Sequence, residues 1–479
     1  MATKKTYLSF AVCGFLMLTG CATGVPQVLP SSFERKAFTG TVDNAETSWP
    51  TRDWWRTFGG TELADLIERA QADNRDLAIA TARIAEARAQ VVIQRSALFP
   101  QINFQSSGDR SNSHAMLVPN GKPVATNNVF AASLEGTYRL DIWGLTRSNV
   151  RSASEALKAA HFSEQAVRLN LTAHVANAYF NVVALRERIA ITKDDIDAIN
   201  ALFDVIKLKV AAGTLSRLEL VQEQAQLSVQ QAKLPILQQQ ELEWRGALAV
   251  LVGQPPQEFD IEAQRWEAIS PPAVNPGLPS DLLLRRPDVA QAEANLASAH
   301  ANLDAARAAF LPQFSLSGAG GYASATIGAL TSGSSFIWSA AAGISQTIFT
   351  GAKLVGEKRL ALATQQKLIA SYQGAVLNAF ADVEDALGEV RNYSLAEDHF
   401  EQAVDAAKEA FDISQLQYRQ GAADLIVVLQ TQQTVVGVRE QLAQVRLSRI
   451  EALIHLYQAL GGGWVESTSD RTQLMRQVR

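Results

Sequence analysis

An internal duplication places the strongest constraint on the fold. The stretches SALFPQINFQ (96–105) and AAFLPQFSLS (308–317) both leave an alanine-rich, helix-like sequence at a proline and then alternate apolar with polar residues. Pro100 and Pro312 lie 212 positions apart. The same spacing relates several further identical pairs: Asp76 and Asp288, Ala80 and Ala292, Ala85 and Ala297, and Arg95 and Arg307. A sequence that repeats in this way predicts two copies of one structural unit.

Each half predicts the same succession of elements. A helix precedes the proline, two strands follow, and a long helix of roughly 65 residues, or about 100 Å, turns back at a glycine into a shorter helix. Gly144 pairs with Gly351, and Gly213 pairs with Gly421. The helices are expected at about 61–99, 146–211 and 217–251 in the first half, and at about 287–311 and 424–460 in the second.

The long helices carry a sustained heptad pattern. Apolar residues step by four and three positions along the first of them: Leu171, Val175, Ala178, Val182, Leu185, Ile189, then Ile196, Ile199, Phe203, Ile206 and Val210. Such a pattern predicts left-handed coiled-coil packing against other helices.

The strands are amphipathic. The second strand of the first half alternates apolar residues (Phe130, Ala132, Leu134, Tyr138, Leu140, Ile142) with polar ones (Ser133, Glu135, Thr137, Arg139, Asp141). In the second half the pattern returns at Phe314 and Leu316 and again from Trp338 to Ile348, with a less polar opposite face. Runs of this length are sufficient to cross a bilayer at the usual strand tilt.

The N-terminus predicts export and lipid attachment. Lys4 and Lys5 precede an apolar run over residues 7–18 that is too short to span a bilayer, which is typical of a signal peptide. The segment Leu18-Thr19-Gly20-Cys21 resembles a bacterial lipobox, so Cys21 is expected to be acylated, and Ala22 favours sorting to the outer membrane. Beyond it, no apolar run reaches the roughly 18 residues of a transmembrane helix, so any span is expected to be a β-barrel.

Four strands in one chain are too few to close such a barrel. Outer membrane barrels begin at about eight strands, and an open edge in lipid leaves backbone polar groups unpaired. Two copies would give a barrel filled by side chains, whereas three would give twelve strands and leave a passage. Glu135, Arg139 and Asp141 are then candidates for the wet lumen. The predicted fold class is mainly α with a membrane β-barrel, four strands per protomer, and long helical hairpins that form an α-barrel.

The duplication, the lipobox, the two prolines and LPSDLLLRRPDVAQAEANLASAHANLDAARAAFLPQF (278–314) together resemble the TolC-like outer membrane factors, specifically the NodT-type lipoproteins of RND efflux systems. The resemblance covers about Trp54 to Gly461. It implies a homotrimer with a twelve-stranded outer membrane barrel and a periplasmic helical tunnel. It also implies two partners, a periplasmic adaptor and an inner-membrane RND pump, and no energy source of its own. The expected cargo is drugs or other small toxic compounds.

The same resemblance puts the hairpin tips at Gly213 and Gly421 at a narrow periplasmic aperture. Tyr418 matches a family tyrosine, and Glu219 occupies an acidic family position. Where the family carries acids in the second repeat, this chain has Val427 and Gln430, and Asp424 is the nearby carboxylate. An apolar or amide constriction is therefore expected in place of acidic rings. Tyr418, Asp424, Glu219 and Arg217 are expected to hold the aperture closed.

Several classes of function are not indicated. The net charge is −5 with no basic patch, which does not favour nucleic-acid binding. The histidines lack metal-ligand spacing, and no nucleophile elbow or phosphate loop is found, so neither an enzyme nor a cofactor is expected. Pro287 and Asp288 are explained by the start of a helix. Two alternatives remain: an exit channel for polypeptides, as in type I secretion, and a coiled-coil envelope lipoprotein that conducts nothing.

The chain is expected to consist of six segments. In order they are a signal peptide at 1–20, a lipidated linker at 21–60, a first repeat at 61–253, a linker at 254–280, a second repeat at 281–461 and a tail at 462–479. The sequence does not name the cargo, the cognate pump or the gating movement.

Overall fold

The computed structural model describes residues 50–112, 126–262, 266, 269 and 285–464. The chain divides into the units Met1–Lys36 and Ala37–Arg479, and all described residues belong to the second. The expected signal peptide, the Cys21 lipid site, most of the linker after the first repeat and the tail from residue 465 lie outside the described residues.

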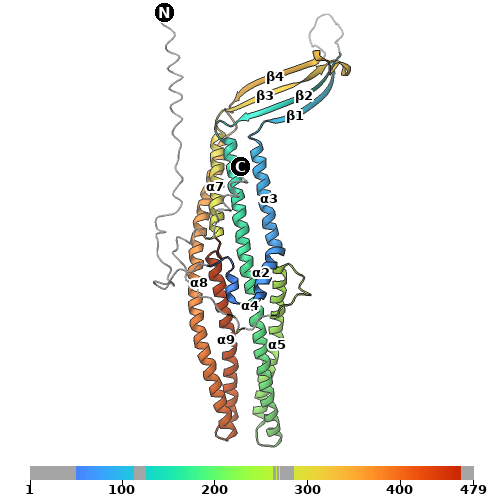
Figure 1. Cartoon of the computed structure of the whole chain (residues 1–479). Coiled ribbons are helices and arrows are strands. Elements are labelled where there is room, and N and C mark those ends of the chain that lie inside the picture. The colour runs from blue at the N-terminus through green and yellow to red at the C-terminus, as the bar shows by residue number, and fades with distance from the viewer. Residues whose placement is uncertain (1–49, 113–125, 263–265, 267–268, 270–284, 465–479) are drawn as a thin grey trace, which may run out of the picture. The chain divides into compact units, whose positions relative to one another are not determined.

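The described elements follow one another in the predicted order (Figure 1). The first half comprises η2 (Trp54–Phe58), α2 (Thr61–Asp73), α3 (Arg75–Ser96), β1 (Gln101–Asn112), β2 (Thr126–Leu140), α4 (Leu145–Ala211) and α5 (Arg217–Val252). The second half comprises α7 (Pro287–Ala308), β3 (Gln313–Ser324), η4 (Ile327–Ala329), η5 (Gly333–Ser335), β4 (Phe336–Ser345), α8 (Lys353–Arg419) and α9 (Leu425–Ala459).

The helices of the two halves match closely in length. Both α3 and α7 have 22 residues, and both α4 and α8 have 67. Pro100 and Pro312 directly precede β1 and β3, so both prolines stand between helix and strand as the sequence predicts. Each proline lacks the N–H that another helical turn would need.

One prediction about the first helix is wrong. The expected continuous helix at 61–99 is broken at Asn74, whose backbone is extended and separates α2 from α3. The Asn74 side chain accepts hydrogen bonds from the amides of Asp76 and Leu77 at 2.9 and 3.1 Å. An asparagine that caps a new helix in this way satisfies its first N–H groups, and the alanine-rich pattern on both sides conceals the break.

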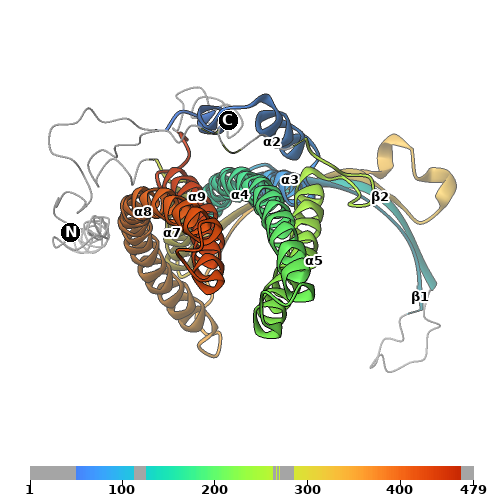
Figure 2. The same cartoon turned by 90° about the horizontal axis from the view of Figure 1, so that it is seen from below.

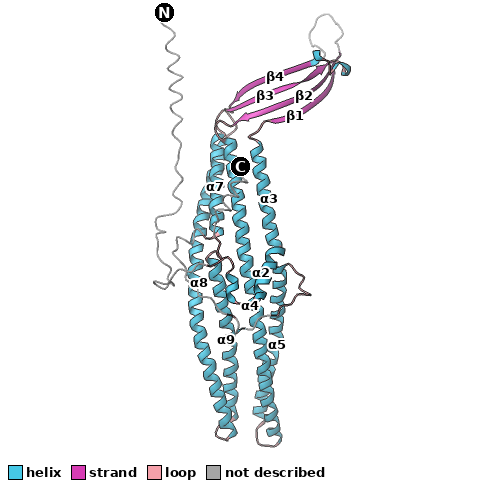
Figure 3. Ribbon diagram, in the orientation of Figure 1, coloured by secondary structure: helices cyan, strands magenta, loops and turns pink. Residues whose placement is uncertain are grey.

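The four strands form one antiparallel sheet in the order β1-β2-β3-β4 (Figure 3). Rows of paired residues cross all four strands, such as Phe104, Leu134, Gly320 and Trp338 on one face. The neighbouring row on the other face contains Asn103, Glu135, Ala319 and Ser339. The sheet therefore has one face rich in large apolar side chains and one face that is mainly small and polar.

Three residues that were expected on strands lie beyond them. Asp141 and Ile142 follow the last residue of β2, and Ile348 lies after the end of β4. The period-two pattern continues past the hydrogen-bonded ladder in both places, so the sequence alone does not mark where the strand stops.

The long helices form two hairpins, α4–α5 and α8–α9, which lie side by side with α9 next to α4 (Figures 1 and 2). Many heptad positions of α4 are buried, among them Val175, Val182, Ile199 and Ile206. Among the described residues, none of the helices combines the length and hydrophobicity needed to cross a membrane.

The main core cluster of the described residues lies where the N-terminal segment meets the middle of α4, the end of α5 and the last turns of α9. Trp54 stacks on Tyr457 with ring centroids 4.8 Å apart and an interplanar angle of 10°. Phe58 packs against Phe180 and Tyr457 in the same cluster. Burying several aromatic side chains at one level of a long bundle fixes how its helices and the N-terminal segment pack there.

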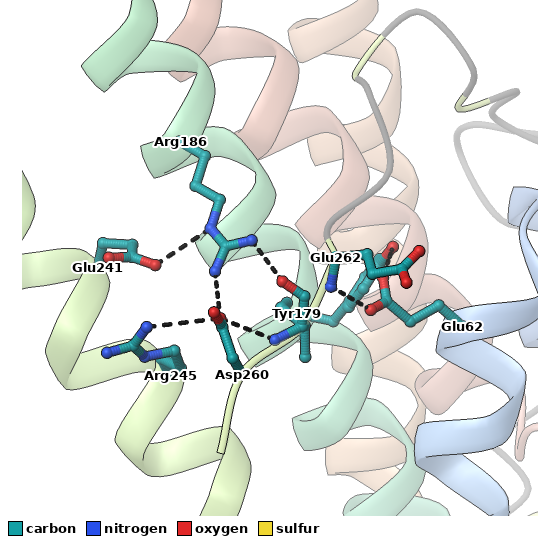
Figure 4. A network of polar contacts seen from close by, with 8 residues as sticks. Glu62, Tyr179, Arg186, Glu241, Arg245, Asp260 and Glu262 are labelled. Atoms are coloured by element: carbon teal, nitrogen blue, oxygen red, sulfur yellow. Dashed lines mark hydrogen bonds and ion pairs between the residues drawn. The ribbon is translucent and has the colours of Figure 1, made fainter. Parts of the chain in front are cut away.

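A polar network attaches the segment after α5 to the bundle (Figure 4). Arg186 of α4 donates to Glu241 of α5 at 3.1 Å and to Asp260 at 2.6 Å. Glu62 of α2 accepts from the amide of Glu262 at 2.6 Å. These contacts hold the beginning of the inter-repeat connection against three helices.

Candidate functional site

Both hairpin tips turn through a left-handed glycine. At the first tip Gly213 has φ +72°, and the amide of Thr214 donates to the carbonyl of Lys209 at 2.9 Å. At the second tip Gly421 has φ +71°, and the amide of Ala422 donates to the carbonyl of Gln417 at 2.9 Å. Glycine adopts this conformation without the strain that a Cβ would add, and the turn satisfies the last carbonyls of α4 and α8.

The return helices begin differently. Ser216 caps α5, because its hydroxyl accepts from the amide of Leu218 at 3.1 Å while donating to the Glu219 carboxylate. Ser216 and Glu219 have the Ser-x-x-Glu spacing of a capping box, and the hydrogen bond from the Ser216 hydroxyl lowers the pKa of Glu219. Asp424 is the N-cap of α9, and its side chain makes no capping hydrogen bond with the described residues. The Asp424 carboxylate is exposed at the tip.

A small apolar cluster packs the two tips against each other. Ile206 of α4 lies against Leu425, Val428 and Leu429 of α9, all of them buried. Partly buried residues from α4, α5, α8 and the first turn surround them: Leu202, Val210, Leu215, Leu220, Phe411 and Tyr418. The tips therefore behave as one packed unit within a chain.

A polar contact joins the two hairpins beside this cluster. The Lys209 ammonium donates to the Tyr418 hydroxyl at 2.9 Å and lies 4.4 Å from the centre of its ring. Tyr418 is one of the predicted site residues, whereas Lys209 was missed. A signal was available, since Lys209 stands four residues before Gly213 and Tyr418 three before Gly421. Both residues lie in the last turn of a long helix and face the same tip cluster.

The remaining aperture candidates are spread over the tips. Asp424, Val427 and Gln430 are exposed at three-residue spacing on α9, and Arg217 is exposed at the start of α5. Among the described residues, no hydrogen bond or ion pair joins the six aperture candidates to one another. Within a single chain the structure thus brings Tyr418 to Lys209 and Glu219 to Ser216.

The lumen candidates also differ in position. Glu135 and Arg139 lie on β2, paired with Ala319 and Ser315 of β3 on the mainly polar face. Asp141 lies past the strand, and its carboxylate accepts from the amides of Thr146 and Arg147 at 3.0 and 2.8 Å. Its role in one chain is to cap α4, so its expected place on the polar strand face was wrong.

In the described part of the chain, no group of three or more histidine, cysteine, aspartate or glutamate side chains is arranged to hold a metal ion.

Comparison with known proteins identifies the family. The model of the outer membrane efflux protein family matches residues 66–254 and 278–462. The chain belongs to the outer membrane efflux protein family. The pyoverdine export outer membrane protein OpmQ of Pseudomonas aeruginosa is 36% identical over 432 residues, which cover 89% of this chain and 90% of that protein. The probable efflux pump outer membrane protein TtgC of Pseudomonas putida is 29% identical over 477 residues and covers 98% of each chain.

A solved structure gives the same result. The outer-membrane channel OprN superposes with a TM-score of 0.84 at 25% identity, over 90% of this chain and 97% of that one. The chain therefore has the TolC-like fold and is the outer membrane channel component of an efflux system. Members of the family are channels of tripartite efflux systems rather than enzymes.

Proposed function

We propose that this chain is the passive outer membrane exit channel of an RND-type tripartite system. Three copies form the channel, and a periplasmic adaptor and an inner-membrane RND pump deliver the cargo. The observation that carries the proposal is the four-stranded sheet, in which β1 and β4 are the edges. In a bilayer the polar groups on both edges require partners, which neighbouring copies supply.

Three copies suit the number of strands in the sheet and the chemistry of its two faces. Twelve strands enclose a lumen wider than side chains can fill, whereas about eight do not. Large exposed residues such as Phe104, Trp338 and Ile344 lie on the apolar face, which suits lipid. Glu135 and Arg139 lie on the opposite face, which lines the lumen in this arrangement.

At the other end of the channel, the tips at Gly213 and Gly421 form the periplasmic aperture. Tyr418, Asp424, Glu219 and Arg217 hold it closed, and we add Lys209 because its ammonium joins the two hairpins of one chain through Tyr418. Val427 and Gln430 are exposed on α9 and give the constriction an apolar and amide character. This composition disfavours a strongly cation-selective aperture.

The domain organisation is part of the proposal. The mature protein begins at a lipidated Cys21 and continues through a linker to residue 60, a first repeat at 61–253, a connection at 254–280, a second repeat at 281–461 and a tail at 462–479. The lipid chains and the strands then attach the protein to the same membrane.

The cargo class is small organic molecules. OpmQ is named for pyoverdine export and TtgC for an efflux pump, and both resemble this chain over most of its length. In this proposal the channel supplies a passage and a gate, and the inner-membrane pump supplies the energy.

Two measurements test the proposal. Native mass spectrometry of the purified lipoprotein should give three copies per particle, and deletion of the gene should increase susceptibility to small toxic compounds. Complementation with the Cys21→Ser chain serves as the control for the lipid anchor. A stable monomer, or a deletion strain that loses only secreted polypeptides, would reject the proposal.

A further inference from the structure

Glu223 is a buried carboxylic acid without a described partner. It lies on α5 two turns from the first hairpin tip, and its residue is 1% exposed. No described group forms a hydrogen bond with its Oε1 atom. A carboxylate in such surroundings loses its hydration without compensation, so the neutral acid is favoured.

Glu223 occupies a position where a coiled coil normally places an apolar residue. The buried residues of α5 near it are Leu227, Gln230 and Leu237, which continue the heptad stripe that faces α4. Leu220, one turn earlier, belongs to the apolar cluster of the tips. Ionisation of Glu223 would therefore place a charge within the packed interface of the hairpin and disturb its packing.

In the second hairpin, the residue at the corresponding position forms hydrogen bonds. With the 208-residue spacing of Gly213 and Gly421, Glu223 corresponds to Thr431 and Ile206 to Ser414. Ser414 and Thr431 share a hydrogen bond of 2.8 Å, and Thr431 also donates to α9 carbonyls at 3.0 Å. In the first hairpin the residue that corresponds to Ser414 is Ile206, which is fully buried and offers no polar atom.

The charged groups around Glu223 do not compensate for its burial. Near this level α4 carries Asp204 and Lys207, both exposed, and Lys209, whose ammonium is bound to Tyr418. The neighbouring helix α9 contains no titratable residue between Asp424 and Arg439. On α5 itself the nearest charges are Arg217, Glu219 and Lys233. Burial alone raises the pKa of Glu223 to about 7.

We infer that protonation of Glu223 stabilises the packed hairpin tips. The side chain is neutral when the tips are packed together and ionised when they separate. The inference rests on the proposed function, since it assumes that the tips form the gate. The packed state binds the proton more tightly than the separated state, in which water reaches the carboxylate. Lowering the pH favours the packed tips, and raising the pH favours their separation.

Channel recordings test the effect on the gate. In planar bilayers, raising the pH on the side of the tips from about 5 to about 8 should increase the open-to-closed ratio of the wild-type channel at least tenfold. Glu223→Gln and Glu223→Leu cannot ionise, so both should stay closed across this range. Glu243→Gln is the control on the same helix, because Glu243 is exposed, lies far from the tips and is not one of the aperture candidates, so this variant should leave the pH response unchanged.

Infrared difference spectroscopy of the detergent-purified protein tests the proton itself, whether or not the protein conducts. The wild-type minus Glu223→Gln spectrum should contain the C=O band of a protonated carboxyl, and this band should disappear with a midpoint near pH 7. Absence of the band at pH 5.5, or a pH response that persists in both Glu223 variants, would overturn the inference. A band that titrates in a protein that forms no channel at any pH would instead reject the proposed function on which the inference depends.

Discussion

The two halves of the chain share one interhelix contact where each return helix ends, but they differ near the hairpin tips. In the first half the Asn74 side chain donates to the carbonyl of Leu251 at 3.0 Å, and in the second half Arg286 donates to the carbonyl of Ala459 at 3.3 Å. Both donors stand at the N-cap position of the helix before the strands, although only the Asn74 side chain makes capping hydrogen bonds, and both acceptors lie in the last turn of the return helix. The duplication thus repeats a contact, although the side chains that make it differ.

Arg286 makes more polar contacts than Asn74, its counterpart in the first half. It forms a bidentate ion pair with Asp288 at 2.7 and 3.0 Å and reaches Asp382 of α8 at 2.9 Å. Near the tips the difference is reversed, since the second half has a hydrogen-bonded pair at Ser414 and Thr431. The first half has Ile206 and Glu223 there, and no described residue forms a hydrogen bond with the Glu223 Oε1 atom. The comparison shows that the repeated backbone is shared, while each half has its own side chains at the junction and near the hairpin tips.

The largest expected effect comes from the glycines that end the two return helices. A Cβ on Gly461 would lie 1.9 Å from the carbonyl oxygen of Arg285, and a Cβ on Gly253 would lie 2.8 Å from that of Asp73. Gly461→Ala should therefore lower the free energy of unfolding by at least about 3 kcal/mol, and Gly253→Ala by about 2 kcal/mol. Thermal unfolding in detergent measures both. Gly246→Ala is the control, because its Cβ would meet only Pro256 at 4.0 Å; an equal loss there would reject this explanation.

Removing the two junction donors should give the next largest effects. Arg286→Met removes the ion pairs with Asp288 and Asp382 and the hydrogen bond to Ala459, and because both carboxylates are partly exposed it should cost about 2 kcal/mol. Asn74→Ala removes one cap and one interhelix hydrogen bond and should cost about 1 to 2 kcal/mol, whereas Asn74→Ser keeps a capping oxygen and should cost less. Melting curves of the three variants test the order. If Asn74→Ala proved more costly than Arg286→Met, the added role of Arg286 would be wrong.

Exchanging the residue pairs near the tips tests the comparison directly. Ile206→Ser together with Glu223→Thr places the pair of the second hairpin in the first, so the pH dependence of gating should disappear while the channel still folds. In the second hairpin, Ser414→Ala should weaken stability by about 1 kcal/mol and leave the pH response in place. Conductance at two pH values separates the outcomes, and a pH response that survives the exchange would show that Glu223 is not its source.

The smallest effects are expected at the turn glycines. No described atom lies within 4 Å of a Cβ built on Gly213 or Gly421, so alanine meets only the strain of a positive φ. Each substitution should cost about 1 kcal/mol, and the two costs should be equal within error. Thermal unfolding provides the comparison, and a much larger loss at one tip would indicate that the tips are not equivalent.

The sequence predicted most of the fold because the duplication and the periodicities are local signals. The prolines, the strand alternation at Phe130 to Leu140 and the long heptads each specify one element without reference to the rest. The break at Asn74 and the capping role of Asp141 were missed, since each depends on a single side chain bonding to the backbone. At the tips, the sequence places Lys209 and Tyr418 just before the two turn glycines, but their contact with each other depends on how the two hairpins pack.

The most direct test of the account is the single-channel conductance of tip variants. Tyr418→Phe removes the hydroxyl that binds Lys209, and Lys209→Met removes the ammonium, while Lys207→Met alters an exposed lysine two residues away. If three copies form a channel that the tips hold closed, the first two variants should open more often than wild type, and the third should not differ from it. Unchanged conductance in both Tyr418→Phe and Lys209→Met would contradict the assignment of the gate to these tips.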